Sequence, residues 1–79
     1  MIIYLALDND EPILSSDTEE NLMKRLDNYM GVDLGHSKRI DVNKITNIHS
    51  NLLAIVTYKS KWNTKEFIDI FKIWGVEVK

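Results

Sequence analysis

Residues 59–65 combine basic side chains with an aromatic one, a composition typical of binding sites. The run is Lys59-Ser60-Lys61-Trp62-Asn63-Thr64-Lys65. Asn63, with Glu66 three residues later, forms the capping-box pattern of a helix start. The free N–H groups and positive dipole of such a start attract phosphate or carboxylate. We therefore predict that this cluster binds a partner, the alternative interpretation being a solvated basic connector. The predicted residues are Lys59, Lys61, Trp62 and Lys65.

Two tyrosines, Tyr4 and Tyr58, lie in apolar segments of strand character. In nucleic-acid-binding proteins that place aromatic side chains on an open sheet, those rings stack on bases. The Lys/Arg-Gly-Phe/Tyr motif of these proteins is absent from this sequence. Nucleic-acid binding therefore ranks below protein binding and self-association, and Tyr4 and Tyr58 remain candidate partner-binding residues.

Acidic side chains gather between residues 8 and 20. The candidate acidic surface comprises Asp8, Asp10, Glu11, Glu19 and Glu20. The first three resemble the start of a calcium loop, but the glycine at loop position six and the closing glutamate at position twelve are missing. We predict an acidic surface without a metal. It forms either a negative ridge that competes for a nucleic-acid groove or a solubilising surface.

The sequence lacks the motifs of known enzyme classes. It has no Gly-rich phosphate loop, no supported Ser-His-Asp motif and no zinc spacing of histidines. His36 and His49 both lie in segments of turn character, which is typical of surface histidines. The absence of cysteine removes disulfides, thiolate metal sites and cysteine nucleophiles. We predict no catalytic site, no metal and no cofactor, and hence a protein that is not an enzyme.

The 79 residues are enough for one domain, residues 1–79, with a thin core. The absence of cysteine, together with an N-terminus that starts with Met1-Ile2-Ile3 and has no basic leader, predicts a cytoplasmic protein. No apolar run reaches the length of a membrane span. Residues 1–35 contain eight acids and two bases, whereas residues 36–79 contain eight bases and four acids. The halves either present surfaces of opposite sign or interleave and cancel.

The first half of the chain has the pattern of a strand followed by a helix. Residues 2–7 form an unbroken apolar run that predicts a buried strand. Ile13 and Leu14 form either a short antiparallel strand or an extended lead into the helix. Ser16 or Asp17 is expected to cap that helix, and Gly31 to end it. Its apolar face is expected to carry Leu22, Met23, Leu26, Tyr29 and Met30.

The second half predicts two strands, a helix and a last strand. Residues 38–49 fit either a helix or a strand with a bulge near Asn43 and Lys44, and we prefer the strand. His49-Ser50-Asn51 suits a hairpin turn before a strand at 52–58. A second helix is expected from Asn63 to Gly75, with a short strand at 76–78. Phe67, Ile70, Phe71 and Trp74 are expected on its inner face.

This order, β-α-β-β-α-β, predicts an α+β ferredoxin-like sandwich with a four-stranded antiparallel sheet and two helices on one face. Strands 2–7 and 52–58 are apolar on both sides. If Ile3, Leu5 and Leu7 face the helices, Ile2, Tyr4 and Ala6 face away. Because leaving an apolar sheet face in water is unfavourable, we expect a homodimer, a protein partner or residues 12–15 to cover it.

The chain is very short, lacks cysteine, begins with Met1-Ile2-Ile3-Tyr4-Leu5 and is rich in Ile, Asn, Lys and Asp. In this general character it resembles the small accessory proteins of tailed bacteriophages. The resemblance implies an early protein that binds and redirects a host or defence component. The expected function is thus a small protein-binding inhibitor that acts by occlusion in the host cytoplasm. The alternative is a nucleic-acid-binding module that uses the Lys/Trp cluster.

Overall fold

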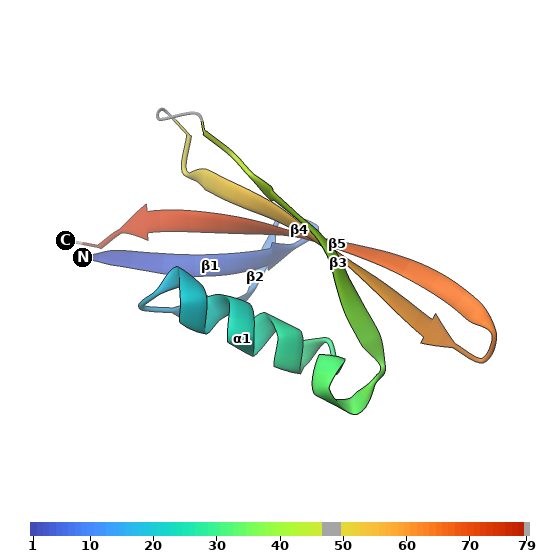
Figure 1. Ribbon diagram of the computed structural model, residues 1–79. Coiled ribbons are helices and arrows are strands. Elements are labelled where there is room, and N and C mark those ends of the chain that lie inside the picture. Colours follow the sequence, from blue (N-terminus) through green and yellow to red (C-terminus); the bar gives the residue numbers. More distant parts are fainter. Residues whose placement is uncertain (47–49, 79) are drawn as a thin grey trace.

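A computed structural model describes residues 1–46 and 50–78, and shows one antiparallel sheet with a helix on one face (Figure 1). The sheet has five strands in the order β2-β1-β5-β4-β3. The elements are β1 (Ile2–Asp8), β2 (Glu11–Ser16), α1 (Glu19–Tyr29), the 3-10 turn η1 (Val32–Leu34), β3 (Ser37–Lys44), β4 (Leu52–Trp62) and β5 (Lys65–Glu77).

The predicted ferredoxin-like sandwich is wrong. The fold is mostly β, with five strands instead of four and one α-helix instead of two. The predicted second helix at 63–75 and the short strand after it are one long strand, β5, which pairs with β4 from Trp62↔Lys65 to Leu52↔Trp74. The suggested strand at Ile13 and Leu14 is confirmed as part of β2, an edge strand antiparallel to β1.

The turn between β4 and β5 explains why a strand forms where a helix was predicted. Asn63 and Thr64 have φ values of 50° and 71°, and Trp62 pairs directly with Lys65. Two central residues with positive φ are what a tight type I′ hairpin turn requires, and asparagine favours this conformation. Asn63 therefore turns the chain into a hairpin and does not cap a helix. The β-branched and aromatic residues that follow suit a strand.

The first helix is confirmed, although its cap lies one or two residues later than expected. Thr18 is the N-cap, and its Oγ1 accepts a hydrogen bond from the Asn21 backbone N–H at 3.1 Å. Leu22 and Leu26 are fully buried against the sheet. Gly31, at φ 71°, follows the helix in the left-handed conformation, as expected of a C-terminal stop.

The ambiguous segment at 38–49 is a strand as far as Lys44, and residues 45 and 46 follow outside the strand. β3 pairs with β4 from Ser37↔Ser60 to Lys44↔Ala54. The irregularity in register lies between Arg39 and Asp41, not near Asn43 and Lys44 as expected. His49 and part of the predicted hairpin turn lie outside the described residues.

The core lies between α1 and the middle of the sheet. Its buried side chains are Ala6, Leu22, Leu26, Ala54, Val56, Tyr58, Phe71 and Ile73. Side chains alternate along strands, so Tyr4 and Ala6 face α1, whereas Ile3, Leu5 and Leu7 face away. This is the reverse of the arrangement considered from the sequence.

Candidate functional site

The structure brings Lys59, Lys61, Trp62 and Lys65 together at one end of the molecule. They lie on the end of the β4–β5 hairpin, residues 59–70, which we call the hairpin end and which extends past β1 (Figure 1). Lys59 Nζ lies 3.2 Å from Glu66 Oε2 across the two strands. Because the cluster surrounds a hairpin turn, it has no helix N-terminus, and the predicted attraction of an anion by a helix dipole does not apply.

A hollow of about 430 Å³ lies between the hairpin end, η1 and the end of α1. We call this hollow the groove. Its lining includes Tyr29, Met30, Leu34, His36, Lys61 and Trp62. Leu34 is 76% exposed and Trp62 is 66% exposed, so apolar side chains of both walls contact solvent. Side chains alternate along β4, so Lys61 directs its side chain away from the side of Trp62, whereas Lys65, paired with Trp62 across the turn, lies on that side. The groove thus combines apolar walls with a lysine beside Trp62, an arrangement suited to an apolar ligand that carries negative charge.

Two glycines shape the η1 wall of the groove. Gly31 and Gly35 flank η1 with φ values of 71° and 75°. A Cβ on Gly31 would lie 3.1 Å from Cβ and Cδ2 of His36, so the close approach of His36 requires glycine there. The Ser37 hydroxyl donates a hydrogen bond to the Met30 carbonyl at 2.6 Å, which holds the start of β3 against the end of α1.

Tyr58 belongs to the core and does not line the groove. Its side chain is fully buried, and its hydroxyl donates a hydrogen bond to Asp27 Oδ1 on α1. Arg39 Nη2 on β3 lies 3.7 Å from Asp27 Oδ2. Burial raises the pKa of the Tyr58 hydroxyl well above its ordinary value, and the hydrogen bond to Asp27 raises this pKa further. Tyr58 therefore links the sheet to α1 as a protonated hydrogen-bond donor. Its ring is buried and does not contact a partner.

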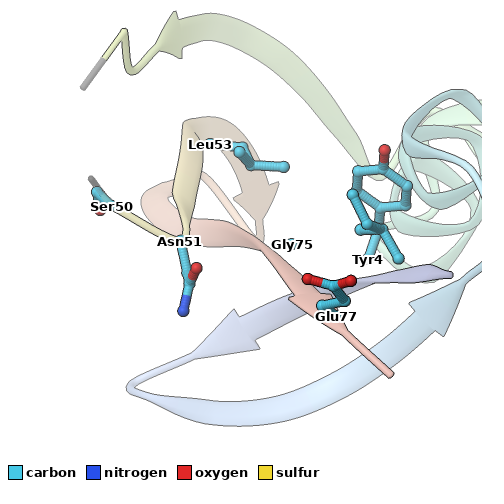
Figure 2. A pocket seen from close by; sticks show the side chains of 7 residues that line it. Tyr4, Ser50, Asn51, Leu53, Gly75 and Glu77 are labelled. Carbon is cyan, nitrogen blue, oxygen red and sulfur yellow. The ribbon is translucent and has the colours of Figure 1, made fainter. Parts of the chain in front are cut away.

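Tyr4 lies far from the hairpin end, beside a second hollow of about 270 Å³ (Figure 2). Leu53, Gly75 and Glu77 line this hollow with Tyr4. A Cβ on Gly75 would lie 3.0 Å from Cδ1 of Leu53, so the absence of a side chain there leaves room for Leu53. The predicted binding residues therefore separate into a cluster at the hairpin end, a buried Tyr58 and a half-buried Tyr4.

The five predicted acidic residues do not form one ridge. Asp8, Asp10 and Glu11 surround the β1–β2 turn, where Asp10 Oδ1 lies 2.8 Å from Lys72 Nζ. Glu19 and Glu20 begin α1 at the opposite end of β2. Glu19 Oε1 lies 2.8 Å from Lys44 Nζ of β3. Glu20 Oε1 lies 3.5 Å from Lys24 Nζ. The acidic surface is thus divided into two groups, one partly neutralised by one lysine and the other by two.

The sheet face opposite α1, which we call the open face, carries an apolar surface. The register places Leu5 beside Trp74, and Ile3 beside Val76. Further along the sheet, Leu7 and Ile55 flank the Lys72 position. Trp74 Nε1 is buried without a hydrogen-bond partner among the described residues. The predicted homodimer or protein partner on this face stays a prediction.

The described residues contain neither a membrane-spanning helix nor a group of potential metal ligands. In residues 1–46 and 50–78, no helix is long and apolar enough to cross a membrane. Within the same ranges, no three His, Cys, Asp or Glu side chains are grouped in a way that could hold a metal ion. His36 lies in the wall of the groove, and His49 is outside the ranges.

Several exposed residues near the predicted cluster are not among the predicted binding residues. The spacing of the first helix predicts Tyr29 on its inner face, but more than half of the Tyr29 surface is exposed. Leu34 lies in a segment predicted as a loop, and Ile68 in one predicted as a helix, whereas the structure places them in η1 and β5. The Asn63-Thr64 pair was the signal for the hairpin, because it separates two segments rich in β-branched and aromatic residues.

Comparisons with models of protein families, with curated proteins and with solved structures give no match.

Proposed function

We propose that this protein is a non-enzymatic protein-binding module that binds a segment of its partner in the groove. The observation that carries the proposal is the exposure of Tyr29, Leu34 and Trp62 around one hollow. Tryptophan and tyrosine are enriched among the residues that dominate binding energy in protein interfaces. A folded chain of this size gains little by leaving three large apolar side chains in water, unless a partner covers them.

The charges around the groove favour a partner segment that combines apolar and acidic side chains. Lys61 lines the groove, and Lys65 lies opposite Trp62 at the turn. Neither lysine forms an ion pair within the described part of the chain. Complementary charge around an apolar centre speeds association and selects the partner.

The proposed biological role is inhibition by occlusion. A domain of 79 residues that binds one site on a larger protein can block access to that site without catalysing a reaction. The resemblance to small accessory proteins of tailed bacteriophages supports a host or defence protein as the target. The proposed location is accordingly the host cytoplasm.

Nucleic-acid binding is the second candidate function, and one observation favours it. The hairpin end is a two-stranded ribbon that carries Lys59, Lys61 and Lys65, with Trp62 exposed. The major groove of DNA admits a two-stranded β-ribbon. Lysines on such a ribbon would contact phosphates, and binding would weaken steeply as salt rises.

The experiment is affinity capture from a bacterial lysate with identification by mass spectrometry. The wild-type chain is compared with the double variant Trp62→Ala/Lys61→Glu. The matched control, Ile2→Ala/Lys24→Glu, also truncates one exposed apolar side chain and reverses one exposed lysine, but at sites outside the groove. We expect one protein to be captured by the wild type and the control, and a loss of at least about tenfold with the groove variant.

Salt distinguishes the two candidate functions. Capture of a protein partner should persist from low to moderate salt, because apolar burial is not screened. Equal capture by all three chains would contradict a role for the groove. If the wild type instead retains only nucleic acid, and loses it at moderate salt, the second function replaces the first.

A further inference from the structure

One side of β5 lacks a neighbouring strand over the hairpin end. β1 pairs with β5 from Ile2↔Glu77 only as far as Leu7↔Lys72. β5 itself begins at Lys65, so residues 65–71 pair with β4 alone among the described strands. At about 3.3 Å per residue, this free edge is roughly 20 Å long. An exposed strand edge with apolar side chains is a ready template for another strand.

The hydrogen bonds at the other end of β5 show which backbone groups point to the free edge. The Val78 N–H donates to the Met1 carbonyl on the β1 side at 2.8 Å. The Gly75 N–H donates to the Asn51 carbonyl on the β4 side at 2.9 Å. Because successive residues alternate and β5 pairs without a bulge of its own, even-numbered residues point to the β1 side. Glu66, Ile68 and Ile70 therefore present their N–H and C=O groups at the free edge.

The area of the molecule is consistent with one uncovered interface. The chain exposes 5789 Å² and measures 45 × 21 × 19 Å along its principal axes. A folded monomer of this mass would expose roughly 4,900 Å². The excess is close to the roughly 800 Å² that each partner contributes to a standard interface. Ile68 and Ile70, each 56% exposed, lie on this edge.

The sequence of the free edge is complementary to itself. We infer that it binds the same edge of a second copy, antiparallel and centred on Phe67. This register sets Phe67 opposite Phe67 and Lys65 opposite Asp69 of the second copy. It also pairs Glu66 with Ile68, whose N–H and C=O groups both face the interface. Aromatic pairs and pairs of opposite charge are favourable cross-strand neighbours.

The register also fits the space beside β1. The last paired residue of β1 is Leu7, opposite Lys72. With Phe67 at the twofold axis, the strand of the second copy begins at its Lys65, opposite Asp69. Its turn, Asn63-Thr64, then lies beside Ile70 and Phe71, next to the β1–β2 turn. That turn carries Asp8 and Asp10, so it meets the basic tip of the second copy. The homodimer is thereby assigned to the edge of β5, and it does not depend on which partner occupies the groove.

Cysteine cross-linking tests the contact and its register. The natural chain has no cysteine, so each variant has one thiol. In the proposed register the two Phe67 residues form a non-hydrogen-bonded pair with Cα atoms about 4.5 Å apart, within disulfide reach. Phe67→Cys should form a covalent dimer on mild oxidation. The matched control Ile68→Cys should remain mostly monomeric, since its thiols are offset by two residues. Faster cross-linking of Ile68→Cys would overturn this register.

Sedimentation measures the association without a cross-link. Ile68→Pro removes an N–H that points to the free edge, so the bonds between β4 and β5 are kept. We expect a wild-type dimer at tens of micromolar and a dissociation constant at least about tenfold weaker for Ile68→Pro. Lys65→Asp and Asp69→Lys should each weaken the dimer, and their combination should restore it. A monomeric wild type at high concentration, or a double variant without rescue, would overturn the inference.

Discussion

The body of the sheet and the hairpin end differ in almost every physical property. In the body, β1, β5 and β4 lie under α1, and every buried hydrophobic side chain of the described chain lies either there or on α1 itself. The hairpin end, residues 59–70, has no buried residue, and most of its side chains are exposed. It nevertheless continues two strands of the same sheet without interruption.

This difference separates stability from binding. Side chains that face α1 hold the fold together by leaving water, whereas those of the hairpin end keep large apolar groups in water. Binding surfaces are drawn from regions of low local stability. A small domain can therefore extend a strand pair beyond its core and present a recognition surface without giving up core residues.

The largest expected effect is a contrast in stability between the two regions. Leu26→Ala, in the body, should lower the free energy of unfolding by about 2–5 kcal/mol, because it leaves a cavity beneath α1. Trp62→Ala, at the hairpin end, should change it by less than about 0.5 kcal/mol. Urea denaturation of both variants measures the two values. Similar losses would show that the hairpin end contributes to the core.

The second expected effect concerns the hydrogen bond between Tyr58 and Asp27. Tyr58→Phe should lower the free energy of unfolding by about 1.5 kcal/mol, because the bond joins a buried donor to a carboxylate. Tyr29→Phe serves as the control, since the Tyr29 side chain is exposed. Equal stability of the wild type and Tyr58→Phe would contradict the role assigned to this bond.

The same tyrosine predicts how stability depends on alkaline pH. The Tyr58 hydroxyl holds its proton more tightly in the folded chain than in the unfolded chain, where its pKa is about 10. Its stabilising contribution is complete below about pH 10 and is lost as the pH rises toward the folded pKa. Unfolding free energies measured on either side of pH 10 should fall more for the wild type than for Tyr58→Phe.

The smallest expected effect lies at the tip of the hairpin. Thr64 is β-branched and has a φ of 71°, a conformation that costs such a residue free energy. Thr64→Gly should stabilise the turn by about 1 kcal/mol, whereas Asn63→Gly should gain less, because asparagine tolerates positive φ. Amide hydrogen exchange at Trp62 and Lys65 reports this local change. A faster exchange in Thr64→Gly would contradict the turn geometry.

The parts of the fold with a single periodicity could be predicted from the sequence. Residues 2–7 and 52–58 are strands, and the first helix buries Leu22 and Leu26 as expected. Phe67, Ile70, Phe71 and Trp74 fit the spacing of a helix, although the same segment is also rich in the β-branched and aromatic residues that suit a strand. Local spacing alone does not decide between helix and strand here, because pairing with β4 supplies the deciding interactions.

The candidate site was predictable in part for a similar reason. The Lys/Trp cluster stands out by residue type, and its members do meet at the hairpin end. Its setting did not follow, since the groove also needs the end of α1 and η1, which the topology brings near Trp62. The free edge of β5 could not be predicted from the sequence either. It exists because β5 is longer than β1, and strand lengths follow from pairing.

Amide hydrogen exchange of the free and partner-bound chain tests the division between body and hairpin end most directly. The chain is measured alone and with the protein it captures, at a concentration where the partner saturates it. Slower exchange should be confined to residues 59–70 and to residues 29–36 around the groove, with the strands of the body unchanged. Protection centred on β1 and β2, or on the open face of the body, would contradict this account.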